Sequence, residues 1–510
     1  MLSKVFSSAI LGVDAYAVEI EVDITRGLPT MVLVGLPDTS VKESRDRVKS
    51  ALENSGFSQP SKRITVNLAP ADLKKEGPSF DLPIALGILI ASNQLMTEKI
   101  RDYLVIGELA LDGQIRPVKG VLAMALLALK QGKKGVLVPQ ENIQEAAVVQ
   151  GIKALPLQTL SQAVRFLSNE IELKNSEIHP EKIFEQNGYA DLDLSEIKGQ
   201  ALAKRTLEIA AAGSHHLLMI GPPGSGKTLL AKALAGILPS MNLEEALETT
   251  KIHSVAGTLS PEKPLITSRP FRSPHHTVSD VGLVGGGTFP KPGEVSLSHH
   301  GVLFLDELPE FKRNVIEVLR QPLEDGHITI TRAMGSLSYP ARFMLVAAMN
   351  PCPCGYFTDP RRECRCTPLQ VQRYRSKISG PLLDRIDIHI EVPEVKFHEL
   401  SNDQALESSE VVRQRVDQAR EIQKNRFKRK GIFTNGQMNL REIRKHCVLE
   451  TEGKNLLKMA VTELGMSARA HDRILKVSRT IADLANCEMI EAPHVSEAIQ
   501  YRSLDRTMWT

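Results

Sequence analysis

Short apolar runs alternate with amphipathic stretches along the first third of the chain. Runs rich in β-branched residues and bounded by Gly, Pro or polar residues predict strands, and a helical apolar spacing predicts the helices between them. The predicted strands span residues 18–24, 30–34, 63–68, 103–107 and 135–139. Residues 82–91 predict a buried helix, since the run has about half the length that a membrane-spanning helix needs. Residues 1–170 therefore predict a mixed α/β domain.

The pattern of apolar and polar residues changes further along the rest of the chain. Residues 171–190 are polar and aperiodic, which predicts a linker. Residues 191–395 alternate strands, helices and Gly-rich turns, as in a parallel α/β core. Residues 396–510 are highly charged and predict a helical domain. We therefore expect an α/β multidomain protein.

Composition narrows the classes of function. The chain has 510 residues and a net charge of +3, which excludes a wholly basic nucleic-acid coat but leaves room for a local basic track. Aromatic residues make up 4%, which argues against broad base-stacking platforms. Six cysteines are too few for a disulfide scaffold, and residues 5–13 are too short and lack the cleavage site of a signal peptide. We expect a cytoplasmic protein with no membrane partner.

One motif predicts a nucleotide site. Residues 221–228 fit the pattern G-x-x-x-x-G-K-[ST], with a predicted strand before them and a predicted helix after them. In such loops successive N–H groups face phosphates, the Lys reaches the β and γ phosphates, and the Ser/Thr holds Mg²⁺. The residues of this loop are Gly221, Pro222, Pro223, Gly224, Ser225, Gly226, Lys227 and Thr228. ATP and Mg²⁺ are therefore the expected cofactors.

Two further strand ends supply polar partners for this loop. The apolar run before Asp306 and Glu307 predicts a strand whose carboxyl end carries both acids, where α/β proteins bind ligands. Asp306 would position Mg²⁺, and Glu307 would polarise the attacking water. Residues 343–349 predict another strand that ends at Asn350, an amide that could orient water against the γ-phosphate.

These motifs resemble an AAA+ ATPase of the magnesium-chelatase-like, pre-sensor-hairpin group. Residues 269–279, 283–287, 303–311, 349–355 and 473–482 resemble the YifB/ComM family, and the resemblance covers nearly the whole chain. It implies a hexameric, ATP-driven DNA helicase that promotes branch migration. Members of the family act in natural transformation, when single strands recombine into the chromosome. The implied partners are single-stranded and branched DNA and further copies of the chain.

The resemblance also implies roles for single residues. Arg385 corresponds to an arginine finger that reaches the ATP of a neighbouring subunit, although an ion pair with Asp384 or Asp387 is an alternative. Arg469 resembles the sensor-2 arginine of a helical lid formed by residues 396–510. The segment from Ile197 to Gln200 resembles the part that borders the adenine.

DNA contacts are expected on insertions of the core. Residues 327–332 and 337–339 predict a β-hairpin, and by resemblance this hairpin and the insertion before Asp306 face the pore of a ring. The candidate contacts are Arg332, Arg272 and Lys291. Residues 361–377 and 424–430 are rich in cations, although either run could be a solvated face. Adjacent histidines at 215/216, 275/276 and 299/300 point apart if they lie in strands, so we expect structural or hydrogen-bonding roles for them and not a shared metal ion.

An insertion at residues 352–366 contains a cysteine cluster. Cys352, Cys354, Cys364 and Cys366 have the spacing C-x-C-x9-C-x-C. Four thiolates that converge from two turns can bind tetrahedral Zn²⁺, although C-x-C is tighter than usual. The alternative is four reduced thiols packed in a loop.

The first domain resembles the Lon protease domain, an α+β fold of the ribosomal S5 domain 2-like type. The similar segments are residues 75–79, 105–109, 111–118 and 133–139. Lon uses a Ser–Lys dyad, and Ser79 matches its Ser, but Leu122 stands where its Lys would be and Lys119 is shifted by three positions. We therefore expect a non-proteolytic platform. An ATP-dependent protease and a chelatase-type protein-remodelling motor stay as alternative functions.

Overall fold

The computed structural model divides the chain into two compact units. The N-terminal unit comprises Met1–Gln186 and Leu243–Thr267, and the C-terminal unit comprises Asn187–Asn242 and Ser268–Thr510. The structure describes residues 2–185, 192–287, 290–332, 335–357, 359, 362–396, 399, 406–428, 432–464 and 466–504.

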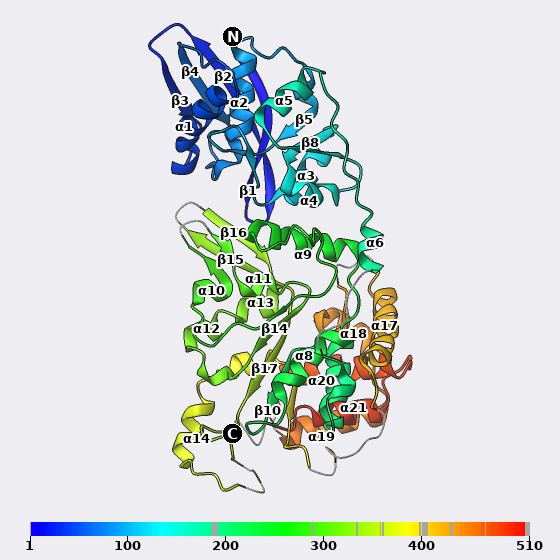
Figure 1. The fold of residues 1–510 in the computed structure, drawn as a ribbon. Coiled ribbons are helices and arrows are strands. Elements are labelled where there is room, and N and C mark those ends of the chain that lie inside the picture. The colour runs from blue at the N-terminus through cyan, green and yellow to red at the C-terminus, as the bar shows by residue number, and fades with distance from the viewer. Residues whose placement is uncertain are drawn as a thin grey trace. The chain divides into compact units, whose positions relative to one another are not determined.

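Two sheets organise the N-terminal unit (Figure 1, blue and cyan). The first has the order β1-β2-β4-β3, in which β3 and β4 are parallel and the other pairs are antiparallel. The second is a parallel sheet with the order β5-β8-β9. The strands are β1 (Leu2–Leu11), β2 (Asp14–Thr25), β3 (Thr30–Val34), β4 (Arg63–Ala69), β5 (Tyr103–Val105), β8 (Gly135–Pro139) and β9 (Lys153–Leu157), with the short hairpin β6 (Glu108–Leu109) and β7 (Ile115–Arg116).

Helices supply the apolar side of this core. The helices of the first 186 residues are α1 (Thr39–Asn54), α2 (Asp81–Ala91), α3 (Val121–Lys130), α4 (Ile143–Ala147), α5 (Leu160–Leu167) and α6 (Pro180–Glu185), and α6 lies within the segment that was predicted as a linker. Almost every residue of α2 is buried, which confirms the buried helix predicted from its unbroken apolar run. Gly87 lets α2 approach β2, because a Cβ there would lie 2.7 Å from Val22 Cγ2.

A segment from the middle of the chain completes the N-terminal unit. Helix α9 (Leu243–Ala256) follows the P-loop helix in sequence, yet it packs on α3. The hydroxyl of Ser254 donates to the buried carboxylate of Glu145, and Lys251 Nζ lies 2.7 Å from Asp14 Oδ1. Residues 191–395 were predicted as one continuous α/β core, but Leu243–Thr267 belongs to the N-terminal unit, so that unit is discontinuous in sequence.

A five-stranded parallel sheet forms the centre of the C-terminal unit, with the order β11-β14-β17-β10-β18. Its strands are β10 (Leu217–Ile220), β11 (Phe271–Arg272), β14 (Val302–Leu305), β17 (Met344–Met349) and β18 (Ile388–Glu391). β10, β14 and β17 are buried along their whole length, as expected for a parallel sheet covered on both faces. The parallel α/β core predicted from the sequence is confirmed.

Helices and two small hairpins surround this sheet. The helices are α7 (Ala201–Gly213), α8 (Lys227–Ile237), α10 (Asp280–Val284), α11 (Glu294–Leu297), α12 (Arg313–Glu317), α13 (Arg320–Asp325), α14 (Pro368–Arg375), α15 (Gly380–Leu383), α17 (Ser409–Arg426), α18 (Leu440–His446), α19 (Thr451–Leu464), α20 (Ala468–Leu484) and α21 (Ala492–Gln500). The hairpins are β12 (Gly285–Gly286) with β13 (Lys291–Pro292), and β15 (His327–Arg332) with β16 (Gly335–Pro340). One hydrophobic cluster joins α7, α8 and the sheet to the last helices. Among the described residues, none of the helices has the length and apolar character that crossing a membrane requires.

Candidate nucleotide-binding site

Residues 221–228, here called the P-loop, follow β10, and Asn350, the predicted sensor residue, follows β17, here called the sensor strand. β10 pairs with β17 in parallel with Ile220 opposite Met349, so Gly221 and Asn350 follow at adjacent strand ends. The N–H of Gly221 donates to the carbonyl oxygen of Met349 at 3.2 Å, which continues the ladder into the loop. Helix α8 then begins at Lys227 and points its N-terminus at the loop. Pairing of the strands thus brings together two motifs that lie far apart in sequence.

The glycines of the loop serve two different purposes. A Cβ at Gly221 would lie 2.1 Å from the carbonyl oxygen of Val392, so only glycine fits there. Gly224 and Gly226 have φ values of 79° and 88°, a left-handed backbone that favours glycine. A Cβ at either position would meet no atom within 4 Å, so open space lies beside the turn of the loop. This geometry fits a phosphate group placed against the N-terminus of α8.

Lys227 lies inside the loop, with its side chain held by the loop itself. Its Nζ donates to the carbonyl oxygens of Gly221 and Pro222 at 2.8 Å each, and it lies 3.3 Å from Asn350 Oδ1. Burial lowers the pKa of Lys227, while the carboxylates of Asp306 and Glu307 act in the opposite direction. The ammonium group is therefore positioned beside both the loop and the sensor amide.

The acidic pair faces the start of α8. Thr228 Oγ1 donates to Asp306 Oδ2 at 2.7 Å, so a hydroxyl and a carboxylate converge on one point. Both are the hard oxygen ligands that Mg²⁺ takes in such sites, so the residues present fit the expected ion. Glu307 has a φ of 52°, in the left-handed region, and its carboxylate is exposed. His276 Nδ1 lies 3.7 Å from Glu307 Oε2, a contact that the sequence analysis did not foresee.

Asn350 is fixed by the helix that follows the cysteine cluster. Tyr374 in α14 hydrogen-bonds to the backbone of Asn350, and Arg375 Nε donates to the carbonyl oxygen of Pro351 at 3.1 Å. Tyr374 and Arg375 are both buried. Arg375 belongs to the cation-rich run at residues 361–377, but its side chain supports the segment after Asn350.

The segment expected to border the adenine touches the P-loop. Gln200 Nε2 donates to the carbonyl oxygens of Pro393 at 2.6 Å and of Ser225 at 3.3 Å. Ile197 is buried in the core beside α8. Pro393 also lines a cavity of about 160 Å³ with Gly221, Pro222, Phe357 and other residues. The structure thus connects this segment, the P-loop and the end of β18.

Arg385, the predicted arginine finger, forms an ion pair with a residue that was not predicted as its partner. Arg385 is buried, and its Nη2 lies 2.5 Å from Glu324 Oε1, so its ion-pair partner is neither Asp384 nor Asp387. Arg469 Nη1 lies 3.6 Å from Asp384 Oδ2, which connects α20 to the residue before Arg385. Asp387 instead accepts from Arg473 Nη1 at 2.8 Å and from the backbone N–H of His216 at 3.0 Å.

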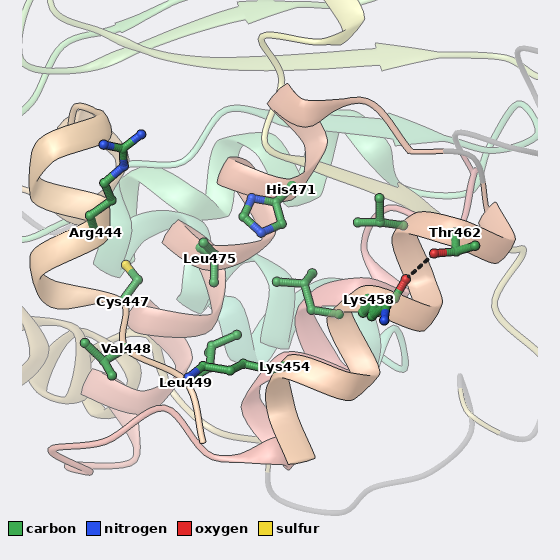
Figure 2. A pocket seen from close by; sticks show the side chains of 11 residues that line it. Arg444, Cys447, Val448, Leu449, Lys454, Lys458, Thr462, His471 and Leu475 are labelled. Carbon is green, nitrogen blue, oxygen red and sulfur yellow. Dashed lines mark hydrogen bonds between the residues drawn. The ribbon is translucent and has the colours of Figure 1, made fainter. Parts of the chain in front are cut away.

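A cavity of about 540 Å³ opens among α18, α19 and α20 (Figure 2). It is lined by Arg444, Cys447, Val448, Leu449, Lys454, Leu457, Lys458, Val461, Thr462, His471 and Leu475. Three Lys or Arg side chains and one His face it, and no Asp or Glu is among its lining residues. A lining that combines apolar and basic side chains is suited to an anionic, partly apolar ligand.

The other candidate DNA contacts differ in whether they form ion pairs within the chain. Arg272 forms a two-pronged ion pair with Glu294, at 2.6 and 2.7 Å. Lys291 is exposed in β13. The predicted hairpin is confirmed as β15 and β16, but the side chain of Arg332 and the turn after it lie outside the described residues.

The two basic runs are partly structural. In residues 424–430, Arg426 pairs with the buried carboxylate of Asp483 at 2.5 Å, and Lys424 pairs with Glu421 at 3.1 Å. In residues 361–377, Lys377 lies 3.4 Å from Glu310. These three cations are therefore engaged in ion pairs within the chain.

One argument about the paired histidines was wrong. The ring centroids of His275 and His276 lie 4.1 Å apart, and those of His299 and His300 lie 3.9 Å apart. These residues lie outside the strands, so the rule that neighbours in a strand point to opposite faces does not apply to them.

The residues at and near the position of the Lon catalytic lysine have other contacts in this structure. The side chain of Leu122 is fully buried in the first turn of α3, and its N–H donates to Glu145 Oε1 at 2.8 Å. The end of the Lys119 side chain lies against Gly257, where a Cβ would be 2.6 Å from Nζ. Lys75 is buried and donates to the carbonyl oxygens of Pro70 and Leu73 in its own loop.

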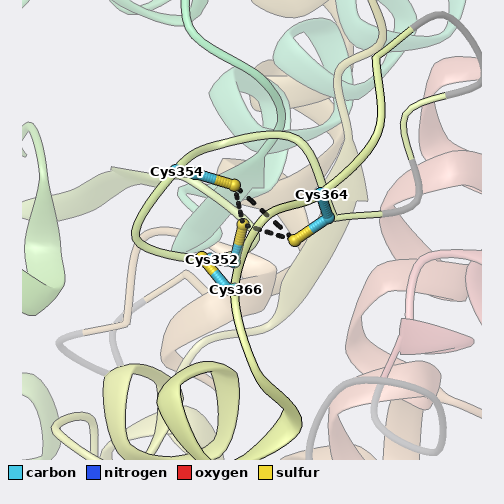
Figure 3. A group of neighbouring side chains, drawn as sticks. All are labelled: Cys352, Cys354, Cys364 and Cys366. Atoms are coloured by element: carbon cyan, nitrogen blue, oxygen red, sulfur yellow. Dashed lines mark hydrogen bonds between the residues drawn. The ribbon is translucent and has the colours of Figure 1, made fainter.

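The four clustered cysteines lie together at the end of the sensor strand (Figure 3). All four Sγ atoms lie within 4.8 Å of one another, as the zinc hypothesis requires. The cysteines are free thiols, so the cluster holds no disulfide.

Comparisons with known proteins agree with these motifs. Family models described as "Magnesium chelatase, subunit ChlI", "Subunit ChlI of Mg-chelatase" and "Magnesium chelatase, subunit ChlI C-terminal" match residues 193–400, 20–142 and 406–502. Competence protein ComM of Haemophilus influenzae is 48% identical over 511 residues, covering 99% of this chain and 98% of that protein. The uncharacterized protein YifB of Escherichia coli is 46% identical over 508 residues, with the same coverage. The chain therefore belongs to the YifB/ComM family of magnesium-chelatase-like proteins.

Proposed function

We propose that this protein is an ATP-driven DNA motor, a helicase that promotes branch migration during natural transformation and homologous recombination. The observation that carries the proposal is the pairing of a complete P-loop site with full-length similarity to a competence protein. The name of that relative connects it to competence, and a P-loop site with an acidic pair is suited to ATP hydrolysis.

Each residue of the site has a chemical task in this proposal. Lys227 would bind the β and γ phosphates of ATP, and Thr228 and Asp306 would hold Mg²⁺. Bound ATP with Mg²⁺ supplies the phosphoryl group whose transfer to water releases the energy. Glu307 would accept a proton from the attacking water, and Asn350, at 3.3 Å from Lys227 Nζ, would orient that water.

The proposed assembly is a homo-hexamer with Arg385 as an arginine finger. Such a finger acting from a neighbouring subunit raises turnover by about 10³ to 10⁵ in related chemistry. Arg385 is paired with Glu324 within its own chain, so delivery to a neighbouring nucleotide would have to release or redirect this ion pair. Arg469, which lies beside Asp384, would report the state of the nucleotide to the lid.

Cationic side chains would hold the DNA backbone. Lys291 and Arg332 lie on the hairpins β12–β13 and β15–β16 of the C-terminal unit. The cavity among α18, α19 and α20 adds Arg444, Lys454 and Lys458. Contacts of this kind bind phosphates without reading sequence, as a motor that moves along any strand requires.

A chelatase-type motor that remodels a protein partner is the second candidate, because the matching family models are described as magnesium chelatase subunits. An ATP-dependent protease is disfavoured, since an apolar Leu122 stands where the base of the dyad would be.

Stimulation of ATP hydrolysis separates these functions. Single-stranded or branched DNA should raise the ATPase rate of a DNA motor, whereas unfolded protein should raise that of a protease. Lys227→Ala should abolish the rate with and without DNA. A rate that no DNA changes, in a protein that hydrolyses ATP, would exclude the DNA motor and leave the chelatase-type function.

A further inference from the structure

The cysteine cluster has the dimensions of a metal site. The Sγ atom of Cys352 lies 3.3 Å from that of Cys354 and 3.7 Å from that of Cys364, and the latter two lie 3.6 Å apart. A zinc ion bound by four thiolates at about 2.3 Å places the sulfur atoms about 3.8 Å apart. A disulfide would require about 2.05 Å. These three sulfur atoms therefore have the spacing of ligands around one ion, and the Sγ atom of Cys366 lies within 4.8 Å of each of them.

The backbone around the sulfur atoms is also arranged for thiolates. The N–H groups of Tyr356 and Arg365 hydrogen-bond to Cys354. Such N–H groups stabilise negative charge on sulfur and orient metal ligands. Cys352 is fully buried, and the other three are partly buried, so the group is shielded without being closed to solvent.

The cluster closes the loop between Asn350 and helix α14. Its first two cysteines follow Asn350, and its last cysteine directly precedes Thr367, which caps the N-terminus of α14 by accepting from the N–H of Gln370. Helix α14 then returns to the start of this loop, where Tyr374 and Arg375 hold Asn350 and Pro351. The cluster and α14 thus fix both sides of the sensor segment.

The same loop touches the P-loop directly. Gly355 has a φ of 87°, and a Cβ there would lie 2.5 Å from Pro223 Cδ. Pro223 belongs to the predicted phosphate-binding loop. A displacement of the cluster would therefore move both the P-loop and Asn350.

We propose that Cys352, Cys354, Cys364 and Cys366 bind one structural Zn²⁺, and that this ion braces the P-loop and Asn350 in the geometry that binds nucleotide. Four thiolates in a tetrahedral arrangement are ligands typical of zinc. The metal site stands independently of the proposed function, and only its effect on nucleotide binding rests on that proposal.

Metal analysis of the purified full-length chain tests the ion. The chain should hold about one zinc per protomer after purification under reducing, metal-replete conditions. Cys364→Ser should lose most of this zinc, whereas the matched control Cys487→Ser, outside the cluster, should keep it. Sub-stoichiometric zinc in the unmodified chain would overturn the proposal, and iron in its place would overturn the identity of the metal.

A spectroscopic measurement covers the case in which Cys364→Ser fails to fold. Cobalt exchanged into the unmodified chain should give the visible absorption of a tetrahedral ion bound by four thiolates. An octahedral spectrum, or none, would overturn the four-cysteine site.

Binding of a fluorescent ATP analogue tests the bracing role. Folded Cys364→Ser, checked by circular dichroism, should bind the analogue about 10-fold or more weakly, the usual scale for loss of support around a site. Gly355→Ala should keep its zinc and also bind more weakly, because it displaces Pro223. Lys227→Ala should lose nucleotide but keep zinc, which separates failure of the metal site from failure of the nucleotide site. Unchanged affinity in zinc-free Cys364→Ser would overturn the bracing role.

Discussion

His216 should make the stability of the C-terminal unit depend on pH. It directly precedes β10, and its Nδ1 accepts a hydrogen bond of 3.0 Å from the backbone N–H of Leu345 in β17. Because a backbone N–H can only donate, Nδ1 carries no proton in this arrangement. Burial lowers the pKa of His216 from 6.5 to about 4, with Asp387 acting in the opposite direction. Protonation would break a bond between the P-loop strand and the sensor strand.

The sign and size of the effect follow from these two pKa values. Between pH 6.5 and about 4 the unfolded chain binds more protons than the folded chain, so stability is present above this window and falls as the pH drops through it. At pH 5 the two values correspond to a loss of about 2 kcal/mol relative to pH 7.5.

Urea unfolding of the full chain at pH 7.5 and pH 5 measures this loss. The transition of the C-terminal unit is recognised by its shift when ATP is added, because a ligand that binds the folded state stabilises it. His216→Asn keeps an acceptor for Leu345 but does not titrate, so it should lose about 2 kcal/mol less than the unmodified chain. His179→Asn, at an exposed position of the N-terminal unit, should behave as the unmodified chain does. If His216→Asn matches the unmodified chain within about 0.5 kcal/mol, the reasoning is refuted.

Three further outcomes are expected. Glu307→Gln should bind ATP but lose turnover in a steady-state ATPase assay, because an amide cannot accept the proton of water. The control Glu310→Gln should stay active, and normal turnover in Glu307→Gln would refute the role of that carboxylate. Ser254→Ala removes a donor to the buried carboxylate of Glu145 and should destabilise the N-terminal unit by about 1–3 kcal/mol in urea unfolding. The exposed control Ser260→Ala should not, and equal urea midpoints for Ser254→Ala and the unmodified chain would contradict this prediction. Affinity for single-stranded DNA should fall with salt with a log–log slope of about −0.7 per phosphate contacted, and salt-independent binding would exclude phosphate contacts.

Local patterns predicted the parts of the fold that depend on local chemistry. The five strands expected in the first domain correspond to β2, β3, β4, β5 and β8, because β-branched runs between turn residues carry that information. The P-loop between β10 and α8 was also predicted, since its glycines and its strand–helix context lie within one short segment. Strand β1 was missed as a strand because its apolar run was weighed only as a signal segment.

Contacts between distant segments could not be predicted in this way. The packing of α9 in the N-terminal unit depends on Ser254 reaching Glu145, 109 positions away in sequence. The partner of Arg385 is Glu324 on α13, and the sequence analysis considered only its near neighbours. The contact of His276 with Glu307 depends on how the loop after β11 folds over β14, although His276 lies in a segment that carried the family resemblance. Periodicity does not encode such pairings, which arise only when the chain is folded.

Branch migration on a three-stranded or four-way DNA junction, with ATP, tests the central claim most directly. The unmodified chain should move the junction and release the displaced strand, and both Lys227→Ala and Glu307→Gln should leave the junction where it started. Movement of the junction by Lys227→Ala at the unmodified rate, or none by an unmodified chain that hydrolyses ATP, would contradict the account.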